Sequence, residues 1–136
     1  MNYIDTNVII SYLNGKDINH SKALNLFKQV GDKVTSQIGI LELRSMLSRT
    51  SNLNENEIEA YIEYLPEIGI KIPEIDINEV FSNAGEIAFK VKMKTLDTLH
   101  ISACIILNAN TFMTFDREFA EKKHVISDMG VTVISG

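Results

Sequence analysis

The sequence predicts an α/β protein with a mainly parallel sheet of five strands and helices on both of its faces. Short apolar strands alternate with longer helical segments along the whole chain, and this order is typical of parallel sheets with crossover helices. The first strand begins almost at residue 1 and is followed at once by polar residues and an apolar helix. The 136 residues, 45% of them hydrophobic, suffice for one core, so residues 1–136 are expected to form a single domain.

The first part of the chain is expected to contain two strands and three helices. After the opening strand, Asn14-Gly15 stops a short helix, Asn19 caps a second helix that Gly31 ends, and Ser36 caps a third. The expected ranges are a strand to Ile4, a helix over Val8–Leu13, a helix from Asn19 to Gly31, a strand over Lys33–Thr35 and a helix from Ser36 to about Arg49.

The second part is expected to contain three more strands. Asn54 and Glu57 form a capping box, and Asp76 and Glu79 open a helix. The apolar stripe of that helix has a period of 3.6 residues and includes Phe81. The expected ranges are a helix after Asn54, a strand over Ile68–Ile72, a helix from Asp76 to Val91, a helix over Leu96–Asn108 capped by Thr95, a strand over Thr111–Phe115, a short helix at Arg117–Phe119 and a strand over Val131–Ile134.

The composition limits the classes of function. Thirteen Lys plus Arg against eighteen Asp plus Glu give a net charge of −5, so any nucleic-acid binding must be local. Cys104 has no partner for a disulfide, and its apolar neighbours favour a buried, inert thiol. No segment has the length and hydropathy of a membrane span or a secretion signal, so we expect a cytoplasmic protein without a membrane partner.

Four acidic residues are expected to converge at one edge of the sheet. Asp5 follows the first strand and Asp116 follows the fourth. Glu42 and Asp97 lie near the starts of crossover helices, which begin at the carboxyl ends of the strands. A parallel sheet aligns these ends, so all four carboxylates should lie near one another.

Each acid also has a simpler explanation. The aspartates can cap helices or favour the positive end of a helix dipole. Glu42 lies on the apolar line of its helix and could pair with Arg44 or Arg49. His100, one turn after Asp97, is interpreted as an oriented structural or supporting group and not as a ligand.

Capping alone does not explain why the four acids should converge. Two carboxylates about 4 Å apart repel by roughly 4 kcal/mol at an effective dielectric constant near 20. Such a cluster either has raised pKa values or binds a cation. Oxygen ligands without Cys or a pair of His favour Mg²⁺ or Mn²⁺, and Mg²⁺ leaves room for phosphate oxygens. The sequence therefore predicts phosphoryl chemistry, with a water activated by the metal as nucleophile.

Four segments, in order, resemble the signature segments of PIN-domain nucleases, and the size of the chain most resembles the VapC toxins of toxin–antitoxin pairs. The segments are Asp5-Thr6-Asn7, Ser36 six residues before Glu42, Leu96-Asp97-x-Leu99-His100-x-x-Ala103 and Thr114-x-Asp116-x-x-Phe119.

This resemblance implies a Rossmann-like sheet with strand order 3-2-1-4-5 and an endoribonuclease that depends on Mg²⁺ or Mn²⁺. It also implies an RNA substrate, a homodimer and a small antitoxin protein that covers the active site. The implied catalytic and metal-binding residues are Asp5, Glu42, Asp97 and Asp116, and the implied supporting polar residues are Thr6, Asn7, Ser36 and Thr114. Cations near these segments could contact RNA, namely Arg44, Lys92, Lys94 and Arg117.

Three other interpretations remain open from the sequence. A haloacid-dehalogenase-like phosphatase also has an acid after its first strand, but its second acid corresponds here to Asn7, which cannot donate a proton as a carboxylic acid does. A receiver domain would need paired acids at the first strand and a Lys after the last one, and neither Tyr3-Ile4-Asp5 nor residues 131–136 provide them. A PIN-like module that binds RNA or protein without catalysis would normally have lost one of the acids.

Overall fold

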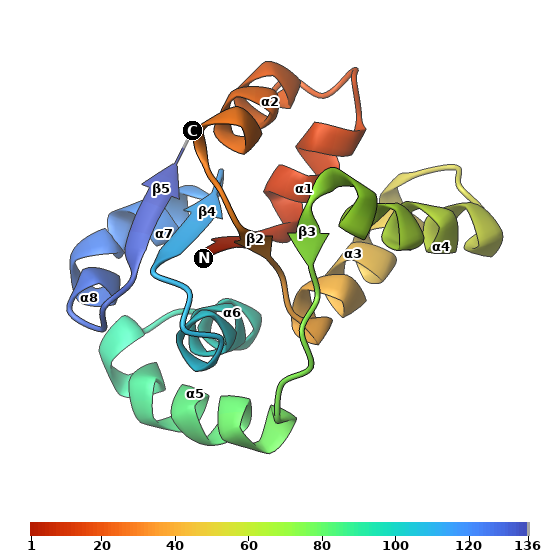
Figure 1. Cartoon of the computed structure of the whole chain (residues 1–136). Coiled ribbons are helices and arrows are strands. Elements are labelled where there is room, and N and C mark those ends of the chain that lie inside the picture. Colours follow the sequence, from red (N-terminus) through yellow and green to blue (C-terminus); the bar gives the residue numbers. More distant parts are fainter. Residues whose placement is uncertain (136) are drawn as a thin grey trace.

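The computed structural model describes residues 1–135, which form one twisted sheet with helices on both faces (Figure 1). The elements are β1 (Asn2–Ile4), α1 (Thr6–Leu13), α2 (His20–Gln29), β2 (Lys33–Val34), α3 (Gln37–Thr50), α4 (Glu55–Tyr64), the 3₁₀ turn η1 (Leu65–Ile68), β3 (Ile70–Lys71), α5 (Ile77–Val91), α6 (Thr95–Ile106), β4 (Thr111–Thr114), α7 (Arg117–Glu121), α8 (Lys123–Ser127) and β5 (Thr132–Ser135).

The sheet has the strand order β3-β2-β1-β4-β5, and every neighbouring pair is parallel. The short β1 is the central strand, where Tyr3 lies opposite Val34 of β2 and Phe112 of β4. The predictions of an α/β fold, a parallel sheet and this strand order are confirmed. Because all carboxyl ends share one edge, the segments after β1 and β4 meet there.

Alternate residues of the central strands point into two separate cores. Tyr3 and Phe112 belong to the core under α5 and α6, whereas Ile4 and Met113 belong to the core under α1 to α4. This alternation is the two-residue period of a strand that is buried on both faces. The helices cover the two faces accordingly, with α5 and α6 on one side and α1 to α4 on the other (Figure 1).

Several helix starts were correctly predicted. Ser36 accepts a hydrogen bond from the backbone N–H of Gly39 and begins α3. Asn54 and Glu57 form the reciprocal capping box at α4, and the Asp76 side chain caps α5. These local bonds satisfy amides that have no partner inside the helix, so the signal is readable from sequence alone.

Other predictions were wrong in detail. Lys94, not Thr95, is the N-cap residue of α6, and it makes no side-chain cap bond. That helix ends at Ile106, before Asn108 adopts a positive φ of 58°. Phe81 lies in the predicted apolar stripe of α5 but is 55% exposed. The expected strand over Ile68–Ile72 is shorter, because Ile68 belongs to η1 and only Ile70–Lys71 pair as β3.

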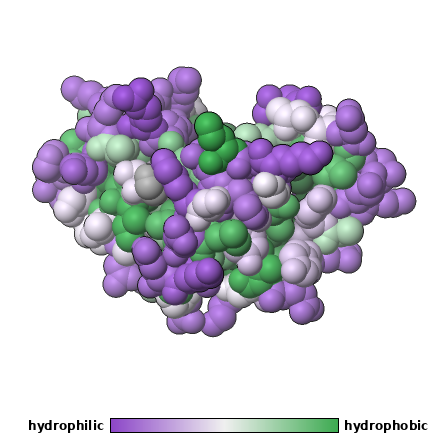
Figure 2. Space-filling model, turned by 90° about the horizontal axis from the view of Figure 1, so that it is seen from above, coloured by the Kyte–Doolittle hydropathy of each residue, from purple (hydrophilic) through white to green (hydrophobic). Residues whose placement is uncertain are grey.

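The face of the molecule seen in Figure 2 is mainly polar. Seen from above, hydrophilic residues cover most of the face in Figure 2, and hydrophobic residues appear only in patches between them. No helix in residues 1–135 is long and apolar enough to cross a membrane.

Gly39 lies where the start of α3 packs closely against the chain after β2. A Cβ atom there would overlap the hydroxyl of the fully buried Thr35. We therefore expect Gly39→Ala to destabilise the fold by about 1–3 kcal/mol, because a buried side chain must move to make room. Thermal unfolding measures the loss. Gly31→Ala is the matched control, since a Cβ atom at Gly31 meets nothing within 4 Å; equal stability of both variants would contradict the packing argument.

Candidate functional site

Asp5 is a buried carboxylate at the carboxyl end of the central strand. It is 4% exposed and is the N-cap residue of α1. Three donors hold it: the backbone N–H of Thr6 at 2.8 Å, the Thr114 hydroxyl at 2.7 Å and the Asn7 side-chain amide at 3.1 Å. Burial nevertheless raises the pKa of Asp5, and the charge of Glu42 raises it further.

Glu42 reaches the same place from the second turn of α3. Its side chain is 18% exposed, and Oε1 accepts a hydrogen bond from Nε2 of His100 at 3.0 Å. Burial tends to raise the pKa of Glu42, but the hydrogen bond from His100 and the polar Thr6 side chain nearby outweigh it and hold the pKa below its usual value. The partner of this partly buried acid is therefore a histidine, and neither of the two arginines that the sequence suggested.

Asp97 lies in the first turn of α6 and is half-buried. Burial, then the charges of Asp116 and Asp5, raise its pKa to about 6. No hydrogen bond to its carboxylate is found within the part of the chain that the structure describes. Asp97 is thus the least fixed of the acids, and both its burial and its acidic neighbours disfavour its ionisation.

The structure brings the four predicted acids together to different degrees. Carboxylate oxygens of Asp5 and Glu42 and a ring nitrogen of His100 lie within 4.8 Å of one another. Asp97 and Asp116 are outside this close group, although their charges act on each other. Asp116 is also the N-cap residue of α7, where Oδ1 accepts from the backbone N–H of Glu118 at 3.0 Å.

Three of the four predicted supporting residues contact this edge directly. Thr114 and Asn7 both donate to Asp5, and Asn7 also accepts from the backbone N–H of Phe115. The Thr6 hydroxyl donates to the Gly39 carbonyl oxygen at 3.3 Å. Ser36 is buried and bonds the Tyr3 hydroxyl instead of an acid.

The predicted RNA-contacting cations are exposed and lie in different settings. Arg44 forms a two-point ion pair with Glu59. Lys92 ends α5 in the left-handed conformation and Lys94 precedes α6, so both lie close in sequence to Asp97. Arg117 begins α7 directly after Asp116.

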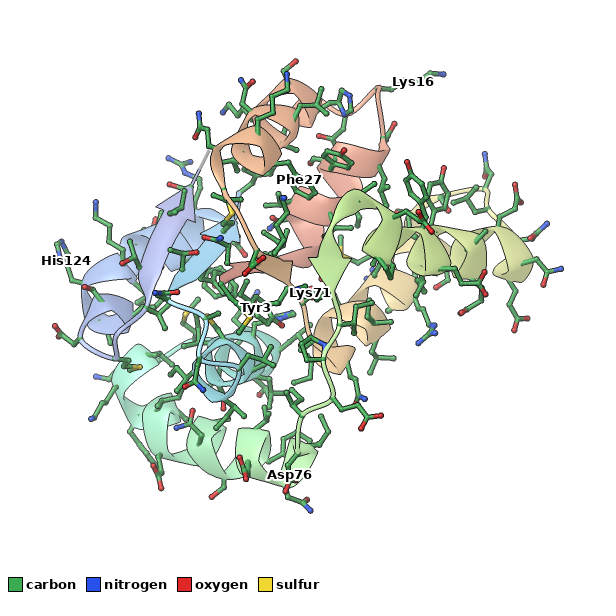
Figure 3. All side chains as sticks on the ribbon, in the orientation of Figure 1. Tyr3, Lys16, Phe27, Lys71, Asp76 and His124 are labelled. Carbon is green, nitrogen blue, oxygen red and sulfur yellow. The ribbon has the colours of Figure 1, made fainter. Side chains whose placement is uncertain are left out.

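Tyr3 is a site residue that was missed from the sequence. It lies inside the molecule (Figure 3), and its hydroxyl is 2.9 Å from Nδ1 of His100. The signal that could have found it is a polar ring end on a central strand, because a buried hydroxyl needs a partner. The His100 ring bonds Glu42, an acid on another helix, through its second nitrogen.

With this geometry established, the comparisons identify the class of protein. Residues 3–125 match the family described as the PIN domain, so the chain belongs to that family. The strand order of this chain differs from the 2-1-3-4-5 order of a receiver domain. Because the chain belongs to the PIN-domain family, the haloacid-dehalogenase-like phosphatase is no longer the favoured alternative.

Particular solved structures share the fold over nearly the whole chain. VapBC2 from Rickettsia felis, bound to a promoter DNA fragment, has a chain 18% identical with a TM-score of 0.69, covering 99% of this chain and 98% of that chain. The Mycobacterium tuberculosis toxin VapC20, which cleaves the sarcin–ricin loop, is 14% identical with a TM-score of 0.71 and coverages of 89% and 94%. VapBC-1 from nontypeable Haemophilus influenzae is 19% identical with a TM-score of 0.68 and coverages of 99% and 98%.

No curated protein matches this sequence. At these levels of identity, the likeness to solved structures concerns the fold. The resemblance to PIN-domain proteins that the four segments suggested is confirmed, and the similar structures include VapC toxins.

The crowding of Asp97 has a measurable consequence for stability. Its folded pKa of about 6 lies above its ordinary value, so ionisation costs stability, and this cost develops as the pH rises from about 4 to about 6. Asp97→Asn should therefore raise the melting temperature of metal-free protein near neutral pH and change it little at about pH 4. Melting curves in EDTA at both pH values measure this. Glu86→Gln, which removes an exposed acid on α5, is the control; the same pH-dependent gain there would contradict the local explanation.

Proposed function

We propose that this protein is a metal-dependent endoribonuclease and the toxin component of a VapC-like toxin–antitoxin pair. The observation that carries the proposal is the close approach of the Asp5 and Glu42 carboxylates at the carboxyl edge of a PIN-domain sheet. Asp97 lies outside this close pair, but burial and the charges of Asp116 and Asp5 raise its pKa. Such mutual repulsion is relieved when a cation binds between the acids.

The donor set fits Mg²⁺ or Mn²⁺. The ligands we assign are Asp5, Glu42, Asp97 and Asp116, which offer only carboxylate oxygens, as hard divalent ions prefer. Asp5 and Glu42 are already held in place by hydrogen bonds, so little ordering is needed when an ion binds. When bound, the ion would polarise a phosphate oxygen and lower the pKa of a water molecule.

The residues of the chain then have separate tasks. Thr114 and Asn7 fix the Asp5 carboxylate so that one face of it remains directed to the site. Asp97, whose carboxylate accepts no hydrogen bond within the described residues, is the acid that we assign to accept a proton from the attacking water. Asp116 adds negative charge beside Asp97 and strengthens it as a base. The product of this step is a hydrolysed phosphodiester bond of RNA.

Local cations would offset the acidic site when RNA binds. We assign this role to Lys92 and Lys94, which lie next to Asp97 in sequence, and to Arg117, which follows Asp116. For Arg44, contact with RNA requires that its ion pair with Glu59 open. Each such contact adds to affinity through the phosphates without sequence preference.

An antitoxin protein is the proposed regulatory partner. Chains with this fold occur in structures described as VapBC2 from Rickettsia felis and as a toxin–antitoxin complex from Klebsiella pneumoniae. The proposal extends this partnership to the present chain, with residues 1–136 acting as a single PIN domain in the cytoplasm.

A second copy of the chain is proposed to cover the exposed apolar residues of α5 and α6. Phe89 is 82% exposed and Phe81 is 55% exposed, although both are large aromatic residues. Phe81 and the small residues Ala84, Gly85 and Ala88 of the same helix line a hollow of about 300 Å³. A ring and a hollow on the same face suit a two-fold interface, because each copy can insert its ring into the other.

Mg²⁺ or Mn²⁺ should stabilise the folded protein and support RNA cleavage. Binding adds about 2.7 kcal/mol when the ion is at 100 times its Kd. Asp5→Asn should abolish this thermal shift and lower the cleavage rate at least about 100-fold, since several kcal/mol of transition-state stabilisation are lost. Melting curves with and without metal, and cleavage of total RNA, measure both effects.

Asp32→Asn is the matched control for that experiment. Asp32 is exposed and lies beside Asn2, at the opposite end of β1 from Asp5. It should keep both the metal shift and the cleavage. Metal-dependent cleavage that survives in Asp5→Asn would contradict the proposed nuclease, and metal binding without any cleavage in the unaltered protein would favour a binding module.

The dimer interface is tested at Phe89. Phe89→Ser removes a large exposed ring from the proposed interface. The dimer should therefore dissociate at micromolar concentration, while the monomer stays folded. Size-exclusion chromatography with light scattering measures the mass. Ile18→Ser is the control, because Ile18 is 94% exposed and lies outside α5 and α6. A monomeric unaltered protein would rule out the interface.

A further inference from the structure

We propose that His100 is a positioning residue for Glu42 and that Tyr3 holds His100 in this role. The inference rests on the proposed function, because it concerns how one of the proposed metal ligands is aimed. The starting observation is a buried chain of side chains. Ser36 contacts the Tyr3 hydroxyl at 2.6 Å, Tyr3 contacts Nδ1 of His100 at 2.9 Å, and Nε2 of His100 contacts Glu42 at 3.0 Å.

Both ring nitrogens of His100 are engaged, so neither offers a lone pair to a metal. A nitrogen can ligate a metal only when it carries no proton. Nε2 faces a carboxylate oxygen, which only accepts, so this nitrogen must carry the proton of that bond. His100 is close enough to Asp5 and Glu42 to look like a third ligand, but its bonds give it a different task.

When the His100 ring is neutral, all hydrogen bonds of this series can donate in the same direction, from Ser36 to Glu42. The Ser36 hydroxyl accepts from the backbone N–H of Gly39 and can donate to Tyr3. The Tyr3 hydroxyl then donates to Nδ1, and Nε2–H donates to Glu42. Each group uses both its donor and its acceptor capacity, which selects the tautomer with the proton on Nε2.

Packing fixes the same arrangement. The Tyr3 ring stacks on Phe112 with centroids 5.3 Å apart, and the His100 ring meets Tyr3 edge-on at 5.8 Å. Tyr3 and Phe112 are fully buried and His100 is nearly so. The start of α3 also packs close to the ring, since a Cβ atom at Gly39 would lie in van der Waals contact with Cε1 of His100, at 3.8 Å. The imidazole therefore cannot swing to another acid without disturbing the core.

The contact with His100 sets the orientation of the Glu42 carboxylate. Glu42 lies on a helix and has a flexible side chain, unlike Asp5, which three donors clamp at the end of a strand. With Oε1 bound to His100, the orientation of the carboxylate is set and its remaining lone pairs are available to an ion near Asp5. Groups that orient metal ligands in this way commonly contribute 10- to 100-fold to metal affinity.

The first test observes the ring proton directly. Two-dimensional ¹H–¹⁵N spectra of the histidine rings report which nitrogen is protonated, with Mg²⁺ as the probe ion and His100→Gln used for assignment. We expect the proton on Nε2 of His100 to be present without Mg²⁺ and to remain when Mg²⁺ saturates the protein. Loss of this proton on Mg²⁺ binding would make His100 a ligand and would overturn the proposal.

The second test uses variants that separate positioning from simple packing. His100→Leu should weaken Mg²⁺ binding by about 10- to 100-fold and Tyr3→Phe by about tenfold, whereas His100→Gln, which can still donate to Glu42, should recover much of the affinity. At limiting Mg²⁺, kcat for RNA cleavage should fall and the KM for RNA should not change. Tyr64→Phe removes the hydroxyl of a half-exposed tyrosine and is the matched control.

The outcomes distinguish this inference from the proposed function. Affinity for Mg²⁺ unchanged in folded Tyr3→Phe and His100→Leu proteins would overturn the positioning role while the nuclease stands. An unaltered protein that neither binds Mg²⁺ nor cleaves RNA would overturn the proposed function, and the role of His100 with it. If His100→Leu does not fold, Tyr3→Phe and the ring spectra still decide, because both leave the imidazole in place.

Discussion

The burial of the Asp5 carboxylate at the end of the central strand is the constraint on which the site depends. An ionised carboxylate removed from water is costly unless donors or cations surround it. Three hydrogen bonds meet part of this cost, yet burial still raises its pKa, and a second acid, Glu42, stands beside it. The fold thus keeps a local excess of negative charge that hydrogen bonds alone do not neutralise, and this excess is what a divalent ion would relieve.

The parallel topology makes that concentration of charge possible. Each crossover returns the chain to the same edge of the sheet, so Asp5 after β1 and Asp116 after β4 are placed by the strands. Glu42 and Asp97 arrive on α3 and α6, whose first turns lie at that edge. One backbone amide and two side chains hold Asp5 at the end of β1, whereas a single buried histidine on another helix holds Glu42. Asp97 has no hydrogen-bond partner of this kind within the described residues, and burial and the charges of Asp116 and Asp5 raise its pKa.

The sequence predicted the features that depend on short segments, and it failed for contacts between side chains that are far apart in sequence. Strand order, the acids at the sheet edge and the caps at Ser36 and Asn54 follow from periodicity, short motifs and resemblance to a family. The partner of Glu42 is 58 residues away and competed with two arginines on its own helix, so spacing pointed to the wrong residues. The exposure of Phe81 was missed for a related reason, because a helical stripe shows which residues share a face but not how much of that face another element covers.

Helix capping and a catalytic role were alternative explanations of the acids in the sequence, but in the folded protein one carboxylate can do both. A carboxylate offers about four lone-pair sites. Asp5 uses three of them for Thr6, Asn7 and Thr114, and Asp116 uses one for the start of α7. The bonds that end a strand and begin a helix also fix the direction of the lone pairs that remain. An acid at a helix start is thereby oriented by the fold itself, and a PIN domain can build a site from residues that its secondary structure already needs.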